Sequence, residues 1–193
     1  MARPPTFRRE DVLERAMHTF WAQGYAATSV DDLVRATGLV RASLYHAFGN
    51  KHGLYMEALG HYQELLGARM LGALRGAPDV KQGFRRLFEL VMDDAVSDTT
   101  RRGCMMVNAA TELASRDPDV CRLTAEAEAA KERTFAELIR RGQAQGEISR
   151  EKDPDALAKA LYNTVLGLRV RATRRPTRAE LEPIVAASLS LLD

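Results

Sequence analysis

Apolar residues recur along the chain at the spacing of an α-helix. In three separate segments they fall at intervals of three and four residues, which places them on one face of a helix. No segment alternates with period two over a length that predicts a strand, and the short alternating run 168–171 is expected to end a helix. The helical positions are Leu13, Ala16, Met17, Phe20 and Trp21; Phe84, Leu87, Phe88, Val91 and Met92; and Met105, Met106, Ala109, Ala110 and Leu113.

Polar residues mark where several helices begin. Asp117 and Asp153 each precede a proline, so each offers an N-cap acceptor before a residue suited to the first helical position. Thr177 and Glu180 have the spacing of a capping box. These patterns predict an all-α fold of about nine helices. The helices are expected near residues 8–23, 30–37, 41–48, 51–75, 80–97, 104–115, 118–144, 154–173 and 178–192.

The predicted helix over 51–75 contains three glycines, Gly60, Gly67 and Gly72. Each costs about 1 kcal/mol relative to alanine inside a helix. They predict either a close approach of another backbone or a bend in the helix. A third interpretation is a linker between two domains.

Composition narrows the class of protein. The 193 residues suffice for one or two modest domains, and 46% apolar with 28% charged residues is typical of a soluble globular chain. No apolar run approaches the roughly 20 residues of a membrane span, and no signal peptide is evident. Two cysteines, Cys104 and Cys121, are too few for a disulfide framework. We therefore expect a cytoplasmic protein without a membrane partner.

The net charge of +2 is unevenly distributed. Residues 1–55 hold 7 Lys/Arg against 5 Asp/Glu, and residues 56–193 hold 21 against 21. The excess of positive charge therefore lies in the first 55 residues, which is a weak indication of a polyanionic partner.

Residues 28–51 carry the most specific pattern. Either Thr28 with Asp31 or Ser29 with Asp32 can cap a helix that starts near Val30. Gly38 supplies a left-handed position that ends this helix, and a second short helix follows. Two short helices joined by a glycine turn are typical of a helix-turn-helix, although similar hairpins occur in proteins that do not bind DNA. The expected buried face is Val30, Leu33, Val34, Leu39, Leu44 and Phe48.

The outer face of the second helix suits a DNA groove. It combines a cation, two small residues, a phenol and an imidazole, so its backbone can approach base edges closely while its longer side chains reach phosphates. These residues are Arg41, Ala42, Ser43, Tyr45 and His46.

The stretch from about residue 7 to residue 59 resembles the N-terminal domain of TetR-family (tetracycline-repressor-like) transcriptional regulators. The most specific match is the run Ser43-Leu44-Tyr45-x-x-Phe48-x-Asn50-Lys51-x-x-Leu54, whereas Gly49 departs from the larger or charged residue more common there. The remainder of the chain resembles the family more loosely. The segments that carry this resemblance are Arg102-Gly103-Cys104 and Gly146-Glu147-Ile148. Further matching positions are Phe20, Gly24, Tyr25, Ala27, Thr28, Ser29, Val30, Leu33, Ala36, Gly38 and Leu39.

The resemblance implies a ligand-responsive regulator, expected to be a repressor that binds a palindromic operator as a homodimer and is released by a small molecule. Residues 1–55 would form the DNA-binding domain and residues 56–193 a helical effector-binding and dimerisation domain. No cofactor and no metal are expected, and the chain lacks the sequence motifs of common enzyme classes. An enzyme and a helical adaptor without DNA affinity are the rival interpretations.

Particular DNA contacts follow from the resemblance. Arg41, Ala42 and Ser43 would face base edges. The positively polarised helix N-terminus near residues 28–30 also suits a phosphate. The basic residues Arg3, Arg8 and Arg9 form either an arm that touches DNA or a solvated tail. The residues expected to hold phosphates are Thr28, Ser29, Ser43, Tyr45, His46 and Lys51.

Two helices are expected to form the homodimer, near 154–173 and 178–192, as a four-helix bundle across a two-fold axis. The alternative for their apolar positions is an intramolecular core. The arginines 169, 171, 174, 175 and 178 are interpreted as a solvated loop. The apolar positions are Leu157, Leu161, Val165, Leu168, Leu181, Ile184, Val185, Ser188 and Leu192.

An effector pocket is expected among the C-terminal helices by resemblance. Methionines adapt to apolar ligands, but they also fill ordinary cores. Cys104 follows two arginines at a predicted helix start, which favours a reactive thiol that senses oxidants or electrophiles; the alternative is a buried, inert cysteine. The candidates for the pocket are Phe88, Met92, Cys104, Met105, Met106, Asn108, Glu112 and Tyr162.

Overall fold

The computed structural model describes residues 8–193, and within that range it contains nine α-helices, two short 3-10 helices and no β-strand. The predicted all-α fold is therefore confirmed. The helices are α1 (Arg9–Gln23), α2 (Val30–Thr37), α3 (Arg41–Phe48), α4 (Lys51–Arg75), α5 (Val80–Ser97), α6 (Met105–Leu113), α7 (Pro118–Ala144), α8 (Pro154–Arg171), η1 (Ala172–Arg174), α9 (Arg178–Leu189) and η2 (Ser190–Leu192).

Local signals explain most helix boundaries. Asp117 accepts hydrogen bonds from two backbone amides of α7, and Asp153 accepts one from α8, each ahead of a proline. The capping box of Thr177 and Glu180 starts α9. The C-terminal ends were harder to predict, because α8 and α9 each close in a 3-10 turn rather than in a glycine cap.

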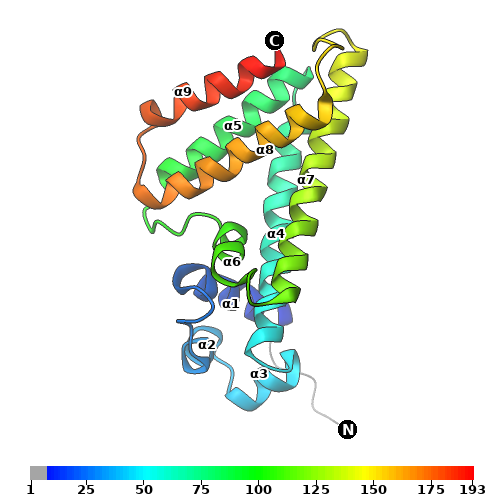
Figure 1. Ribbon diagram of the computed structural model, residues 1–193. Helices are drawn as coiled ribbons and strands as arrows, with labels where there is room; N and C mark the ends of the chain where they lie inside the picture. Colours follow the sequence, from blue (N-terminus) through cyan, green and yellow to red (C-terminus); the bar gives the residue numbers. More distant parts are fainter. Residues whose placement is uncertain (1–7) are drawn as a thin grey trace.

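The helix α4 is continuous over its 25 residues, so the interpretation of this segment as a linker is wrong. A Cβ atom on Gly60 or Gly72 would meet no neighbouring atom, and one on Gly67 would meet only the end of the Lys131 side chain. A close backbone approach does not explain these glycines either. Figure 1 shows α4 running beside α7 from the N-terminal helices into the rest of the molecule.

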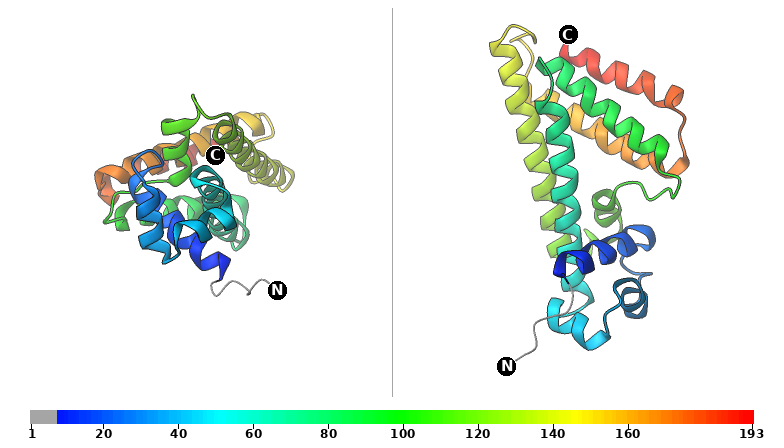
Figure 2. Two further views of the ribbon diagram at one scale, coloured as in Figure 1. Left: turned by 90° about the horizontal axis from the view of Figure 1, so that it is seen from below. Right: turned by 180° about the vertical axis from the view of Figure 1, so that it is seen from behind.

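Two hydrophobic cores divide the molecule, and α4 contributes to both. One core lies between α5, α7, α8, α9 and the second half of α4. The other is formed by α1 to α3 and the first half of α4, together with Cys104, Met105 and Ala109 from the start of α6 and Val120 from α7. Figure 2 shows α1 to α3 gathered at one end, with α8 and α9 toward the other.

The apolar positions of α8 and α9 face this first core. Leu161, Val165, Leu168, Leu181 and Val185 are buried within the single chain, where they pack against α5 and α7. The prediction that they face a partner subunit is therefore wrong, and the intramolecular alternative is confirmed. The sequence of an amphipathic helix shows which face is apolar, but not what that face packs against. Here the apolar faces of α8 and α9 cover α5 of the same chain.

No helix among residues 8–193 combines the length and apolar character needed to cross a membrane.

Candidate functional site

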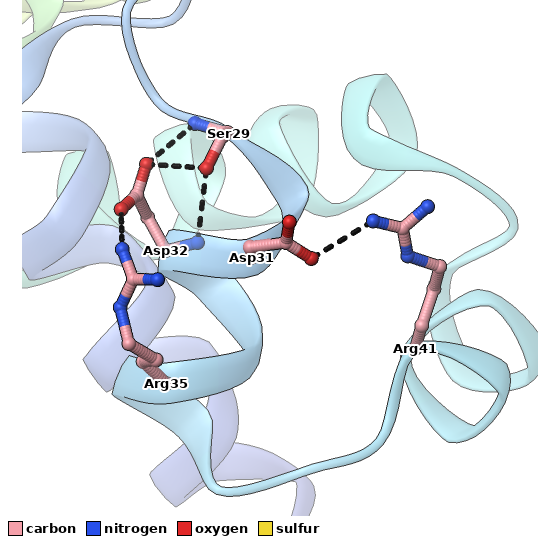
Figure 3. Close-up of polar contacts among 5 residues, drawn as sticks. All are labelled: Ser29, Asp31, Asp32, Arg35 and Arg41. Carbon is pink, nitrogen blue, oxygen red and sulfur yellow. Dashed lines mark hydrogen bonds and ion pairs between the residues drawn. The ribbon is translucent and has the colours of Figure 1, made fainter.

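The helix α2 begins at a complete capping box. Ser29 Oγ accepts a hydrogen bond from the Asp32 backbone amide at 3.1 Å, and Asp32 accepts one from the Ser29 amide at 2.8 Å (Figure 3). The hydrogen bonds from Ser29 hold the pKa of Asp32 below its ordinary value. Of the two caps predicted at this position, the structure therefore contains the one formed by Ser29 and Asp32.

Thr28 lies in the interior rather than on the DNA-facing surface. Its side chain is fully buried, and its hydroxyl donates to the Gly24 carbonyl oxygen at 2.6 Å. A hydroxyl that already donates inside the protein does not reach a phosphate, so the predicted side-chain contact of Thr28 is wrong. The sequence did not distinguish Thr28 from Ser29, because both have an aspartate three residues later.

Gly38 forms the turn between α2 and α3. It adopts φ +74°, and its amide donates to the Val34 carbonyl oxygen at 2.9 Å. Only glycine adopts this left-handed conformation without strain, so the turn is specified locally. The two helices it joins form the predicted helix-turn-helix, with Leu33, Leu44 and Phe48 buried beneath it.

The outer face of α3 presents the predicted base-reading residues. Arg41, Ala42, Tyr45 and His46 are exposed, and Ser43 is half-buried. Arg41 Nη2 lies 2.8 Å from Asp31 Oδ1, an ion pair between the start of α3 and the start of α2 (Figure 3). The hydrogen bond to Asp31 raises the pKa of Arg41 above its ordinary value. The arginine is therefore already paired before any DNA is present.

Lys51 is the first residue of α4, at the same end of the molecule. Its ammonium lies 4.4 Å from the centroid of the Tyr25 ring, a cation–π contact that holds the side chain against the turn between α1 and α2. Asn50 caps α4 by accepting a hydrogen bond from the Gly53 amide at 2.8 Å. This arrangement fixes a positive charge beside the helix-turn-helix.

Sequence reasoning missed Val40, which precedes Arg41 as the N-cap residue of α3. Its side chain is 66% exposed, an unusual position for a large apolar residue. Apolar side chains in a major groove contact the methyl group of thymine. In the sequence, the available signal was the position of Val40 directly before the first residue of the second short helix.

Arg9 does not belong to a flexible arm. Its guanidinium lies 4.4 Å from the Phe48 ring centroid, and Nη2 donates to Glu57 Oε1 at 2.8 Å, so the side chain is docked onto α3 and α4. Arg8 is exposed and pairs with Glu10. Arg3 lies outside the described residues.

One group of potential metal ligands occurs among residues 8–193: His52, Asp117 and Asp119. Its carboxylates already have partners. Asp117 accepts two hydrogen bonds at the start of α7 and lies 2.8 Å from His52 Nε2, and Asp119 pairs with Arg122. The group therefore connects α4 to the start of α7 through the contact between His52 and Asp117.

The predicted pocket residues separate into two groups. Cys104, Met106 and Tyr162 line a cavity of about 170 Å³ between α4, α6, α7 and α8. Phe88, Met92 and Met105 are buried in the two hydrophobic cores and do not line this cavity, so their assignment to a ligand pocket stays a prediction. Helical periodicity marks core residues and pocket residues equally.

Asn108 and Glu112 also have partners within the protein. Asn108 donates to the Arg102 carbonyl oxygen at 2.9 Å. The Glu112 carboxylate accepts hydrogen bonds from the Tyr25 and Ala26 amides at 3.0 and 2.7 Å. Glu112 thus attaches α6 to the turn between α1 and α2. The polar groups of both pocket candidates therefore have partners within the protein.

Cys104 is the N-cap residue of α6 and is 3% exposed. Burial raises the pKa of the neighbouring Tyr62 phenol, and a hydrogen bond with Cys104 adds to this. The burial of Cys104 favours the alternative that it is an unreactive core cysteine. Cys121 is exposed.

A residue that sequence reasoning placed in a solvated loop lies beside this cavity. Arg169 is buried in α8 and lines both the 170 Å³ cavity and a larger cleft of about 590 Å³. The cleft separates α1, which contributes Trp21, from α4, α5 and α8. The neighbouring Arg171, Arg174 and Arg175 are exposed as predicted.

Comparisons with known proteins agree with this geometry. Residues 12–58 match the family of bacterial regulatory proteins of the tetR type, and residues 81–185 match the tetracyclin repressor-like C-terminal domain. The chain is 32% identical over 190 residues to the HTH-type transcriptional repressor ComR of Escherichia coli, covering 98% of this chain and 90% of ComR.

The chain belongs to the TetR family of transcriptional regulators. Another relative is the uncharacterized HTH-type transcriptional regulator YezE of Bacillus subtilis, 31% identical over 194 residues with all of both chains covered. A cysteine mutant of the TetR-family regulator CifR, solved with a 26-bp double-strand operator DNA, superposes with a TM-score of 0.89 at 33% identity over the full length of both chains. Family membership makes this chain a transcriptional regulator rather than an enzyme or an adaptor.

Proposed function

We propose that this regulator is a homodimeric repressor that binds a palindromic operator through α3 and is released by a small molecule. The observation that carries the proposal is the exposed polar face of α3, supported from beneath by α2 and its capping box. ComR is described as a repressor, and CifR was solved on operator DNA, which supports the same role here.

Within this proposal the contacts are divided between bases and backbone. Val40, Arg41, Ala42 and Ser43 lie at the start of α3, the part of a recognition helix that reads base edges. The backbone contacts come from residues whose side chains or amides surround this helix. They are Ser29, Tyr45, His46 and Lys51.

The dimer would use the outward faces of α8 and α9. On α8 the exposed positions at intervals of three and four are Ala156, Ala160, Asn163, Gly167 and Val170. Small side chains allow helices of two subunits to pack closely, and α9 contributes exposed alanines and a proline. A two-fold dimer would place two α3 helices in successive major grooves, about 34–36 Å or a multiple apart.

The two halves of the chain would divide the work. We assign DNA binding to residues 1–55 and effector binding with dimerisation to residues 56–193, with α4 shared by both. The protein would act in the cytoplasm, where bacterial DNA is accessible.

Selection of genomic fragments by the purified protein tests the DNA-binding role. We expect recovery of a palindromic site and a saturable, salt-sensitive shift on that site. Equal affinity for the recovered fragments and for random DNA would contradict the proposal.

Sedimentation at micromolar concentration tests the dimer. Ala160→Glu should shift the protein toward the monomer, because it places a charge within the proposed interface. The matched control is Ala125→Glu, at an exposed position of α7. A wild-type monomer, or equal effects of both substitutions, would contradict the proposed interface.

A further inference from the structure

Arg169 carries a buried positive charge with unused hydrogen-bond donors. Its side chain is 7% exposed, and Nη1 lies 2.9 Å from Asp94 Oδ2. The remaining donors, Nε and Nη2, are buried without a hydrogen-bond partner among residues 8–193. Buried donors of a charged group are costly to leave unsatisfied, so this site favours an additional acceptor.

The carboxylate that neutralises Arg169 is shared. Asp94 Oδ1 also pairs with Arg69 Nη2 at 2.7 Å, so two guanidinium groups compete for one carboxylate. Arg69 is half-exposed and solvent screens its charge, whereas Arg169 has no such access. An uncompensated positive charge therefore lies at the buried member of the three.

The 170 Å³ cavity beside Arg169 is also positive on balance. The charged residues that line it are Arg169, Lys131 and Glu128. Glu128 is exposed, whereas Lys131 is half-buried, and this burial lowers the pKa of Lys131. The cations thus lie deeper than the anion.

The rest of the cavity is apolar and small. Its walls include Leu66, Met70, Val107, Ala110 and Val165. Drug-sized ligands occupy cavities of about 300–1,000 Å³, so this cavity suits a smaller molecule. An apolar body with one anionic group would match both its walls and its charge.

We propose that this cavity binds a small apolar monocarboxylate, whose carboxylate accepts hydrogen bonds from Nε and Nη2 of Arg169. Planar guanidinium and carboxylate groups form such paired hydrogen bonds readily. The inference rests on the proposed function, because it names the chemical class of the molecule that releases the repressor. Lys131, which also lines the cavity, supplies a second positive charge.

Calorimetric titration of the full-length protein tests this inference. The probes are benzoate and hexanoate, each compared with its neutral amide, benzamide and hexanamide. We expect saturable binding of at least one acid, at least about tenfold tighter than its amide, because the amide lacks the charge that Arg169 recognises. The same acid should lower the affinity for the selected operator.

Variants locate the site. Arg169→Gln combined with Asp94→Asn removes both members of the buried pair, so no buried charge is left unpaired, and it should weaken acid binding at least about tenfold. Arg69 loses its partner too, but its side chain is half-exposed and its charge is solvated. Val107→Phe should block binding by filling the small cavity without changing its charge. Arg171→Gln, at an exposed position of the same helix, is the control and should bind the acid as the wild type does. Thermal unfolding checks that each variant is folded.

Two results would overturn the inference: no binding of either acid, or acid and amide binding equally. Acid binding that survives Val107→Phe or the double substitution would also overturn it. Operator affinity of the ligand-free protein is measured separately. A failure to bind any operator would contradict the proposed function, and an intact operator complex without acid binding would contradict only the effector class.

Discussion

The indole nitrogen of Trp21 donates a hydrogen bond to the Gly103 carbonyl oxygen at 3.2 Å. This contact joins α1 to the loop that precedes α6. Asp98 holds the same loop by accepting a hydrogen bond from the Gly103 amide at 3.1 Å, and the guanidinium of Arg102 lies 4.0 Å from the Trp21 ring. The DNA-binding helices are thus attached to the rest of the chain through this loop as well as through α4.

Acid should loosen this attachment. Burial alone would raise the pKa of Asp98, but hydrogen bonds from Thr100, Gly103 and Arg102 outweigh it and hold the pKa below its ordinary value. Such a carboxylate contributes stability that is present above its unfolded pKa, about 4, and is lost as the pH falls through the folded value. Trp21 is the single tryptophan, so its fluorescence should report the change.

The control for this titration is Asp98→Asn. It should remove the part of the fluorescence change that occurs below about pH 4, while helical content is followed by circular dichroism. An identical acid transition in wild type and variant would exclude Asp98 as its origin.

Arg41→Ala should weaken binding to the selected operator by about 1–3 kcal/mol and affect random DNA much less, if Arg41 reads a base. Asp31→Ala leaves Arg41 free and removes a negative charge from the same surface, so it should strengthen binding to random DNA. Competitive binding assays on both kinds of DNA distinguish these effects. Equal losses on both DNAs after Arg41→Ala would make Arg41 a backbone contact.

Lys51→Ala should lower the slope of log affinity against log salt concentration by about one unit, because one phosphate contact is lost. Lys81→Ala is a suitable control, since Lys81 pairs with Asp193 near the C-terminus. The slope should not change for the control. An unchanged slope for Lys51→Ala would remove Lys51 from the phosphate contacts.

Gly53→Ala should destabilise the junction of α3 and α4 by about 1–3 kcal/mol, because a Cβ atom there would overlap the Phe48 carbonyl oxygen. Gly60→Ala lies in open space on the same helix and should instead stabilise the protein by up to about 1 kcal/mol. Urea unfolding measures both. The same sign for the two substitutions would contradict the packing seen at Gly53.

The predictable features were those that neighbouring residues specify. The caps at Asp117 and Asp153 and the turn at Gly38 depend on contacts within a few residues, so the sequence predicted them. For the start of α2 it predicted a cap at either Thr28 or Ser29. The burial of Thr28 and of Arg169 depends instead on how the helices pack, although the hydroxyl of Thr28 finds its partner only four residues away, at Gly24. Arg169 stands among exposed arginines in the sequence, and only the packing of α8 against α5 brings it to Asp94.

The pocket was predicted least well for a related reason. Apolar periodicity identified Phe88 and Met92 as inward-facing, but it carries no information on whether the space they face is filled. The partners of Glu112 are backbone amides 86 and 87 residues away in the chain. Contacts of this range follow from the arrangement of the helices and not from local pattern.

The 25 residues of α4 extend over about 37 Å at the usual rise per residue. In a helix of this length, a rotation of about 5° about one end displaces the other end by roughly 3 Å. Lys51 lies at the end beside α3, and Leu74, near the opposite end, is buried in the other core. In the proposed two-fold dimer, a change of packing around the Leu74 end of α4 would therefore change the distance between the two α3 helices, far from the DNA itself.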